Sequence, residues 1–231
     1  MGATLTGVLD SYSVSSNSLL TGLLGVWELN ETSGLAQDEL ETYDAVSTDV
    51  TYDASGKIGR CFTYDGSDSV SCGSVLHLTS YLTVSCWMKT TNTGADWYAL
   101  VGNYGSVNGF GYDITYYAAS TRIEWGVRST GHTTVYTAVD ADLSNGNWHH
   151  IVCKWDGIAR KIYIDGVDAG SADSWTYAPE SSGDNLYIGD RGTCNAWIGS
   201  IDAVRIWERA LTEDEIEELY AKENAGTGYP W

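Results

Sequence analysis

The chain has 231 residues, with 12 Lys and Arg against 31 Asp and Glu, and therefore a formal net charge of −19 at pH 7. Hydrophobic residues make up 43% of it and charged residues only 19%, a composition typical of a folded globular protein and not of an acidic disordered chain. A surface this negative repels phosphate backbones and anionic membranes, which excludes nucleic acid as a partner. The sequence holds no run of 18 apolar residues, so no membrane insertion is expected.

The ends of the chain differ from its middle. Residues 1–18 are rich in Ser and Thr and weakly patterned, so we expect an N-terminal arm there, one domain over 19–226, and a short tail at 227–231. The first seven residues contain no Lys or Arg and no apolar core, so no secretion signal is expected. The chain would then stay where it is made, leave by lysis or another route, or join an assembled particle.

Between these ends, short segments of β-forming residues are separated by Gly, Asn and Asp turns. The expected strands are Gly25–Leu29, Cys61–Tyr64, Ser69–Cys72, Leu82–Lys89, Tyr98–Gly102, Gly109–Tyr117, Arg122–Arg128, Thr133–Ala138, Trp148–Trp155, Lys161–Ile164, Asn185–Ile188 and Ile198–Trp207. In Leu82–Lys89 every second residue is apolar, which predicts a strand with one face on a core. Many short strands with Gly-rich turns predict an all-β protein, a two-sheet sandwich or jelly roll.

One helix is expected near the C-terminal end. Thr212 and Glu215 have the spacing of a capping box, in which each side chain binds the other residue's amide. Ile216, Leu219 and Tyr220 then fall on one apolar face that can pack on the sandwich. Gly226 is a plausible end of the helix.

The five cysteines are an odd number and contain no CxxC pair, so neither a disulfide framework nor a zinc site is expected. One pairing remains open. If Asp65–Asp68 turns a hairpin, Cys61 lies opposite Cys72, where a bridge is possible. The alternative is that both are reduced, half-buried thiols.

Six segments resemble the laminin-G-like, concanavalin A-like jelly-roll domains, and they occur in the order of that family. They are Leu24–Gly34, Gly59–Gly66, Leu82–Lys89, Trp148–Gly166, Leu186–Gly189 and Trp197–Thr212. The resemblance implies a concanavalin A-like two-sheet jelly roll with one short C-terminal helix. The chain is similar to the stand-alone type of this domain seen in phage structural proteins.

Catalysis is not expected. Related β-glucanases carry two Glu flanking an Asp on one strand, a spacing that places acid and nucleophile on one face. The acidic stretch at 38–41 here lacks a strand pattern, and the stretch at 213–218 is helical. We therefore predict no catalytic residues and no enzyme activity, with a glycoside hydrolase as a remote alternative.

The resemblance implies a structural calcium ion, because related domains commonly bind one where the loop after the first strand meets the penultimate strand. The matching residues are Asp38 and Asp202, with Asp44 able to compensate for a displaced ligand. Two family positions depart from the pattern, since Asn30 and Ala203 stand where acidic residues are usual. An ordinary hydrogen-bonded Asp202 is the alternative.

Glycans are the expected ligand class, because sugar recognition uses aromatic faces with a few planar polar groups. The candidate carbohydrate-binding residues are Trp97, Tyr98, Tyr104, Asp113, Tyr117, Trp125, Trp175 and Arg191. Trp97 and Trp175 lie in polar loops and are expected to be exposed. The alternative is that about half of these aromatics pack between the sheets.

Two functions remain open at this point. The first is a non-catalytic glycan-binding protein of a virion surface or an extracellular adhesin. The second is a structural assembly protein that uses the jelly roll for docking, with the arm 1–18 contacting other virion subunits or other copies in a homo-oligomer.

Overall fold

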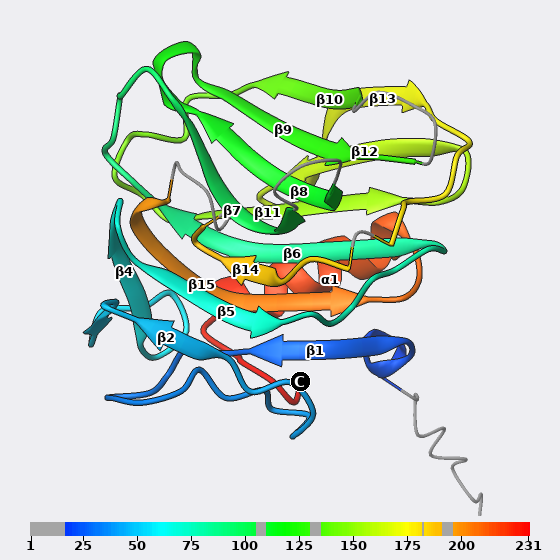
Figure 1. The fold of residues 1–231 in the computed structure, drawn as a ribbon. Helices are drawn as coiled ribbons and strands as arrows, with labels where there is room; N and C mark the ends of the chain where they lie inside the picture. Colours follow the sequence, from blue (N-terminus) through cyan, green and yellow to red (C-terminus); the bar gives the residue numbers. More distant parts are fainter. Residues whose placement is uncertain (1–16, 105–109, 130–134, 182, 191–195) are drawn as a thin grey trace, which may run out of the picture.

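The computed structural model describes residues 17–104, 110–129, 135–181, 183–190 and 196–231, and it shows two antiparallel sheets packed face to face (Figure 1). The eight-stranded sheet, here called the helix-side sheet, runs β13 (Val167–Ser174), β12 (Ala159–Ile164), β11 (His149–Trp155), β6 (Leu82–Lys89), β15 (Ile198–Trp207), β4 (Cys61–Asp65) and β3 (Thr51–Asp53), and β1 (Leu23–Trp27) also pairs with β15. The seven-stranded sheet, here called the open sheet, runs β10 (Val135–Asp140), β9 (Arg122–Val127), β8 (Phe110–Tyr117), β7 (Trp97–Tyr104), β14 (Leu186–Ile188), β5 (Ser69–Gly73) and β2 (Val46–Thr48). This is the jelly roll that the sequence predicts.

The core lies between the sheets and is rich in aromatic side chains. Trp27, Tyr112, Trp125 and Trp197 are each no more than 1% exposed, and they pack with aliphatic residues of both sheets. Burying this apolar surface is the main favourable contribution to folding.

Three strands were not expected from the sequence. β2 and β3 have three residues each, and β13 reads Val-Asp-Ala-Gly-Ser-Ala-Asp-Ser, with few β-branched or aromatic residues. β13 pairs only with β12, at the edge of the helix-side sheet. Its conformation is set by this pairing and not by its own residues.

The segment after β4 is a connection between sheets and not a hairpin. β4 belongs to the helix-side sheet and β5 to the open sheet, so the expected register that set Cys61 against Cys72 is wrong. Both cysteines are buried free thiols. Burial raises the pKa of the Cys61 thiol to about 11, which makes it a poor nucleophile.

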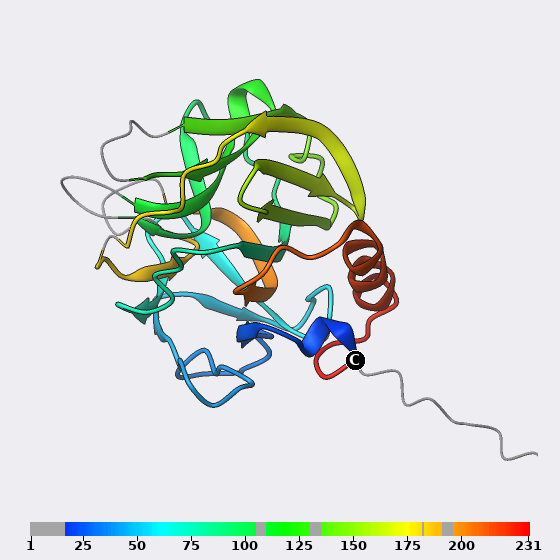
Figure 2. The ribbon, with the colours of Figure 1, turned by 90° about the vertical axis from the view of Figure 1, so that its right-hand side faces the viewer.

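The predicted helix is α1 (Glu213–Asn224), which lies along the outside of the helix-side sheet (Figure 2). Both hydrogen bonds of the expected capping box are present. Ile216 and Leu219 are fully buried, against Val152 and Trp207 of the sheet. Gly226 follows the helix with a positive φ of 84°, as a helix stop requires. Short 3-10 turns lie at Ser18–Leu20 and Ala118–Ser120.

The two ends of the described chain belong to the fold. The side-chain amide of Asn17 donates to the carbonyl of Trp231 (3.1 Å), and the amide of Tyr229 donates to Glu28 (2.7 Å). These contacts join Asn17 and the C-terminal residues to the domain expected over 19–226. No helix in the described part of the chain is long and apolar enough to cross a membrane.

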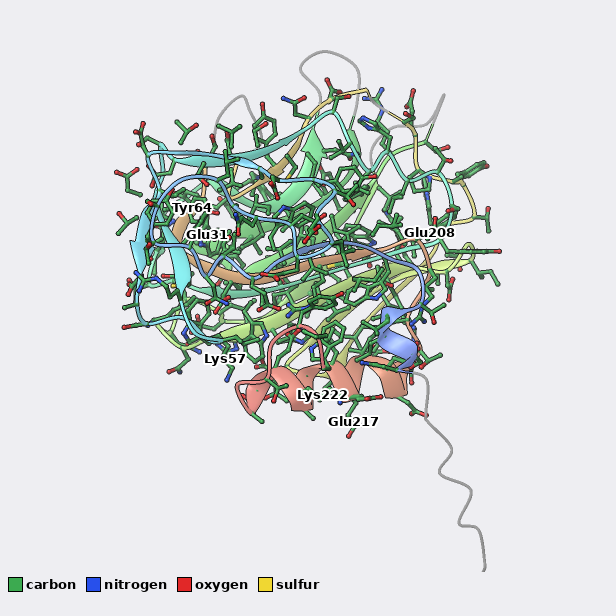
Figure 3. All side chains as sticks on the ribbon, turned by 90° about the horizontal axis from the view of Figure 1, so that it is seen from below. Glu31, Lys57, Tyr64, Glu208, Glu217 and Lys222 are labelled. Atoms are coloured by element: carbon green, nitrogen blue, oxygen red, sulfur yellow. The ribbon has the colours of Figure 1, made fainter. Side chains whose placement is uncertain are left out.

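A buried ionic cluster joins α1 to the sheet beneath it. Arg205 of β15, fully buried, binds Glu28 after β1 (2.5 Å) and Glu223 of α1 (3.0 Å). Glu223 also accepts from the indole of Trp87 (2.6 Å). Lys57 lies above the same indole (4.5 Å) and beside α1 (Figure 3). One guanidinium thus connects two strands and the helix.

Two further titratable groups complete the cluster, His150 and Asp202, both fully buried. Burial lowers the pKa of His150 to about 3, so its imidazole is neutral where it faces Glu223 (3.5 Å). Burial raises the pKa of Asp202 to about 8 and that of Glu223 to about 7. The folded protein therefore holds these two acids partly protonated at neutral pH.

These pKa changes predict how stability depends on pH. The acids bind protons more tightly when folded, so their contribution is present at low pH and is lost as the pH rises from about 4 through 8. His150 acts in the opposite sense, and its contribution is lost as the pH falls from about 6.5 through 3. Of these three groups, only Asp202 and Glu223 still titrate above pH 6.5. The free energy of unfolding should therefore fall between pH 6.5 and 8.5.

The variant Asp202→Asn tests this. Its amide oxygen can still accept from the backbone amides of Lys57 and Ile58, but it cannot ionise. Urea unfolding should show a smaller fall in stability between pH 6.5 and 8.5 than in the parent chain. Glu217→Gln, a change of the same charge on the exposed side of α1 (Figure 3), should keep the parental slope. An unchanged slope in Asp202→Asn would contradict the assignment.

Candidate functional site

The two sheets differ in what covers their outer faces. The helix-side sheet is covered by α1 and the C-terminal residues, whereas the open sheet has no helix over it in the described part of the chain (Figures 1 and 2). In β8, Tyr112, Ile114 and Tyr116 point into the core, so Asp113, Thr115 and Tyr117 point outward. The candidate functional site is this outer face.

Four neighbouring strands of the open sheet bring twelve residues into three cross-strand rows, here called the grid. The rows, each read from β7 through β8 and β9 to β10, are Trp97, Tyr117, Arg122 and Asp140; then Ala99, Thr115, Glu124 and Ala138; then Gly102, Asp113, Gly126 and Tyr136. Because facing residues in adjacent strands lie about 5 Å apart, each row forms one continuous strip.

Aromatic rings define one end of the grid. Trp97 and Tyr117 are stacked, with ring centroids 4.6 Å apart and planes 26° apart. Both side chains are half-buried, so part of each ring faces solvent. The half-buried Tyr136 stands at the opposite end, in the third row.

Two glycines, Gly102 and Gly126, lie in the third row of the grid, and no side chain projects from the sheet at these two positions. Gly126 is required, because a Cβ there would lie 2.2 Å from a carboxylate oxygen of Asp113 and 2.7 Å from the ring of Tyr136. Gly102 is restricted in the same way, since its Cβ would lie 2.6 Å from that of Asp113. The two glycines therefore form a niche around the Asp113 side chain.

Polar groups line the floor between the aromatic ends. Arg122 pairs with Glu124 at 3.1 Å, with the Arg122 side chain 45% exposed and that of Glu124 8% exposed. The Thr115 hydroxyl is fully buried and has no hydrogen-bond partner among the described residues. Such a group is costly unless a water or a ligand satisfies it.

The structure brings together three of the predicted carbohydrate-binding residues: Trp97, Asp113 and Tyr117. Tyr98 packs against the core instead, because it is one residue away from Trp97 on the same strand. The side chain of Tyr104 and all of Arg191 lie outside the described residues.

Two predicted residues are placed in the interior. Trp125 is fully buried next to Tyr112, because β9 alternates and its odd-numbered residues face the core. Trp175 is only 8% exposed, since its ring covers the guanidinium of Arg160 (5.0 Å). The expectation that Trp175 is exposed and available to a sugar is therefore wrong.

The grid also contains Thr115, Arg122, Glu124 and Tyr136, which are not among the residues predicted above to bind carbohydrate. The sequence does contain a pattern that indicates where Arg122 and Glu124 lie. In Arg122–Val127, polar or small residues alternate with large apolar ones. That alternation predicts a strand with one outward face. The alignment of the four strands could not be read from it.

The candidate calcium ligands are divided between two places. The Asp38 carboxylate accepts from the amides of Val26, Leu40, Thr42 and Tyr43, at 2.8–3.3 Å. Asp44 accepts from the amide of Asp38 (2.9 Å), whereas Asp202 binds the amides of Lys57 and Ile58. Among the described residues no three acidic, His or Cys side chains are placed to hold a metal together. The three residues therefore do not form one shared calcium site.

A jelly roll with one covered sheet and one open sheet defines a lectin-like β-sandwich. The family model described as the concanavalin A-like lectin/glucanases superfamily, of laminin G type, matches residues 64–217, about two thirds of the chain. The chain belongs to this superfamily. A comparison with curated proteins finds no match.

Solved structures show the same fold at low sequence identity. Domain 4 of AbnA, a GH43 extracellular arabinanase from Geobacillus stearothermophilus solved with arabinotriose, is 19% identical with a TM-score of 0.68, and the match covers 86% of this chain and 98% of that one. The binding domain of Paraclostridial Mosquitocidal Protein 1 is 17% identical, with a TM-score of 0.69 over 86% and 52% of the two chains. The receptor binding domain of botulinum neurotoxin C/D mosaic serotype is 14% identical, with a TM-score of 0.65 over 87% and 51%.

Calcium binding remains a prediction from the resemblance, and the loop with Asp38 and Asp44 is the place to test it. Asp38, Glu39, Glu41 and Asp44 line a cavity of about 260 Å³ there, and a bound cation would relieve their mutual repulsion. The prediction expects a higher melting temperature in calcium than in chelator, and loss of that difference in Asp44→Asn. Asp142→Asn, an exposed loop aspartate elsewhere, serves as the control. Identical melting in calcium and chelator would contradict the prediction.

Proposed function

We propose that this protein is a non-catalytic glycan-binding domain and that the grid on the open sheet is its binding face. The observation that carries the proposal is the stacked, half-exposed pair Trp97 and Tyr117 beside a low polar floor. Sugar rings present C–H groups to aromatic faces and hydroxyls to polar groups, so such a face suits them on both counts.

The exposed polar group beside the aromatic pair is Arg122, whose side chain is 45% exposed and can donate to sugar hydroxyls. Asp113, Thr115 and Glu124 are no more than 6% exposed and form the buried polar floor. All three lie in rows adjacent to one another, on strands rather than on loops. Side chains on paired strands are held more rigidly than loop side chains, which lowers the entropic cost of binding.

The related structures support a binding role without fixing it. Domain 4 of the arabinanase, which this chain matches almost along that domain's full length, was solved with arabinotriose. Two other neighbours are described as binding or receptor-binding domains. We extend this role to the present chain as part of the proposal, together with a setting on a virion surface or another extracellular surface.

Substitution of Trp97 tests the proposed face. On a glycan array, and in calorimetry with the best-binding oligosaccharide, Trp97→Ala should bind at least about fivefold more weakly, because truncating a central aromatic anchor typically costs more than about 1 kcal/mol. Tyr81→Ala is the matched control, since Tyr81 is 54% exposed and its ring lies tilted against Trp155 of the other sheet, with centroids 6.0 Å apart. It should bind as the parent chain does.

Three outcomes would contradict the proposal. Binding that survives in Trp97→Ala would place the site elsewhere. Release of reducing sugar from the bound glycan would show catalysis. A multimer that is lost on deletion of residues 1–18, in a protein that binds no glycan, would instead support the structural assembly role.

A further inference from the structure

We propose that the guanidinium of Arg122 binds two adjacent hydroxyl groups of a sugar ring stacked on Trp97 and Tyr117, and that Arg122 is the specificity-determining residue of the grid. This inference rests on the proposed function. It adds the chemical class of ligand, a glycan whose rings carry two free adjacent hydroxyls. The aromatic pair alone does not determine this class, because stacking uses only the C–H face of a ring.

Arg122 is the charged side chain directly beside the aromatic pair. It lies in the first row of the grid, where it faces Tyr117, and Tyr117 in turn faces Trp97. The Cβ atoms of facing residues on adjacent strands are about 5 Å apart. The Arg122 side chain is 45% exposed. The edge of a ring stacked on the pair can therefore reach the guanidinium.

The ion pair with Glu124 uses one edge of the guanidinium and leaves the other edge available. The Nε atom of Arg122 lies 3.1 Å from a carboxylate oxygen of Glu124. Four of the five N–H donors of a guanidinium belong to its two Nη atoms. No partner for the Nη atoms of Arg122 occurs among the described residues. These atoms form a planar fork that matches two oxygen atoms lying side by side.

Glu124 restricts the position of this fork. It lies in the second row, between Thr115 of β8 and Ala138 of β10, and its side chain is only 8% exposed. A guanidinium held by a buried carboxylate has fewer orientations to lose when a ligand binds. The same carboxylate balances the charge of the guanidinium. The remaining Nη donors therefore suit neutral hydroxyls, which need a hydrogen-bond donor but no counter-charge.

The backbone between the stacking ring and the guanidinium is short and hydrogen-bonded. Tyr117 ends β8 and Arg122 begins β9, with the 3-10 turn Ala118–Ser120 between them. The amide of Thr121 donates back to this turn (3.2 Å), and its carbonyl accepts from the amide of Ala141 (2.6 Å). The spacing of ring and guanidinium is thus set by a fixed connection, as a site with a defined specificity requires.

Two adjacent hydroxyls on a sugar ring supply the paired oxygen atoms that the fork matches. Hydrogen bonds from a charged donor are stronger than those between neutral groups. A site that hydrogen-bonds a hydroxyl also rejects an analogue without it far more strongly than an apolar contact would. The specificity of the grid should therefore follow the free diol.

Pairs of neutral oligosaccharides test the inference. We would use cello-, xylo-, manno- and arabino-oligosaccharides, each beside a derivative in which the two adjacent hydroxyls of every ring are methylated. In calorimetry, the parent chain should bind the best unmodified member at least about tenfold more tightly than its methylated derivative. The physical reason is that the methyl groups prevent the guanidinium from donating to both oxygens.

Variants of Arg122 then show whether this residue causes the difference. Arg122→Gln should reduce the ratio between the two members to about threefold or less. Arg122→Lys keeps the charge but not the planar fork, so it should also lose most of the ratio. Lys222→Gln is the control, because it removes the same charge from an ion pair with Glu218 on α1 and should keep the parental ratio (Figure 3).

A double variant separates the missing donor from an unpaired carboxylate. Arg122→Gln alone leaves Glu124 without its partner, which could distort the face. Arg122→Gln combined with Glu124→Gln removes both charges of the pair and should show the same loss of the ratio. Melting temperatures verify that each variant is folded.

The outcomes separate the two proposals. Equal binding of the two members by the parent chain, or a parental ratio in Arg122→Gln, would overturn this inference. The glycan-binding function would still stand if Trp97→Ala loses binding. A parental ratio in Arg122→Lys would show that a single charge suffices and would overturn the bidentate contact.

Two further outcomes concern the ligand itself. Uronic acid oligosaccharides that bind more tightly than every neutral member, with that preference lost in Arg122→Gln, would show that the fork takes a carboxylate and would overturn the diol assignment. Binding of no glycan of any kind would overturn the proposed function, and this inference with it.

Discussion

The structure depends on the burial of one guanidinium, that of Arg205, between two carboxylates from different parts of the chain. Arg205 lies in the central strand β15 and binds Glu28 at the end of the first strand and Glu223 in the terminal helix. Removing one member of such a group leaves an uncompensated buried charge, which is strongly destabilising. The bonds therefore fix α1 and the C-terminal residues over the helix-side sheet.

That constraint determines which face of the sandwich is available for function. With α1 in place, Trp87, His150, Val152 and Arg205 are buried on the outer side of the helix-side sheet. The central strands of this sheet are thus covered on both faces. In the described part of the chain, only the open sheet has an outer face without a helix over it. The division into a covered face and an open face follows from the position of one helix.

The sequence predicts the fold well because its signals are local and redundant. Alternation locates Leu82–Lys89 to the residue, a run of β-forming residues does the same for Ile198–Trp207, and the capping box locates the start of α1. Sequence pattern does not identify a strand whose conformation is imposed by pairing, as in β13. It also fails at Asp65–Asp68, because a turn within one sheet and a connection between two sheets use the same residue types.

The candidate site is predicted less completely, for a related reason. Composition identifies aromatic and acidic residues but not the side of the strand on which they fall, so Trp97 and Trp125 look alike in sequence and lie on opposite faces. The partnership of Arg122 with Glu124, and their alignment with Trp97, arise from the register of three strands. Register depends on long-range contacts, which a single sequence does not display.

We expect ligands to bind to the outer face of the open sheet. Hydrogen–deuterium exchange with and without the best-binding oligosaccharide tests this most directly, because every strand of the sandwich is reported in one experiment. Exchange should become slower in β7, β8 and β9 on binding, with no change in α1 or β12. Protection concentrated in α1 or in the turn between β11 and β12, with the open sheet unchanged, would contradict it.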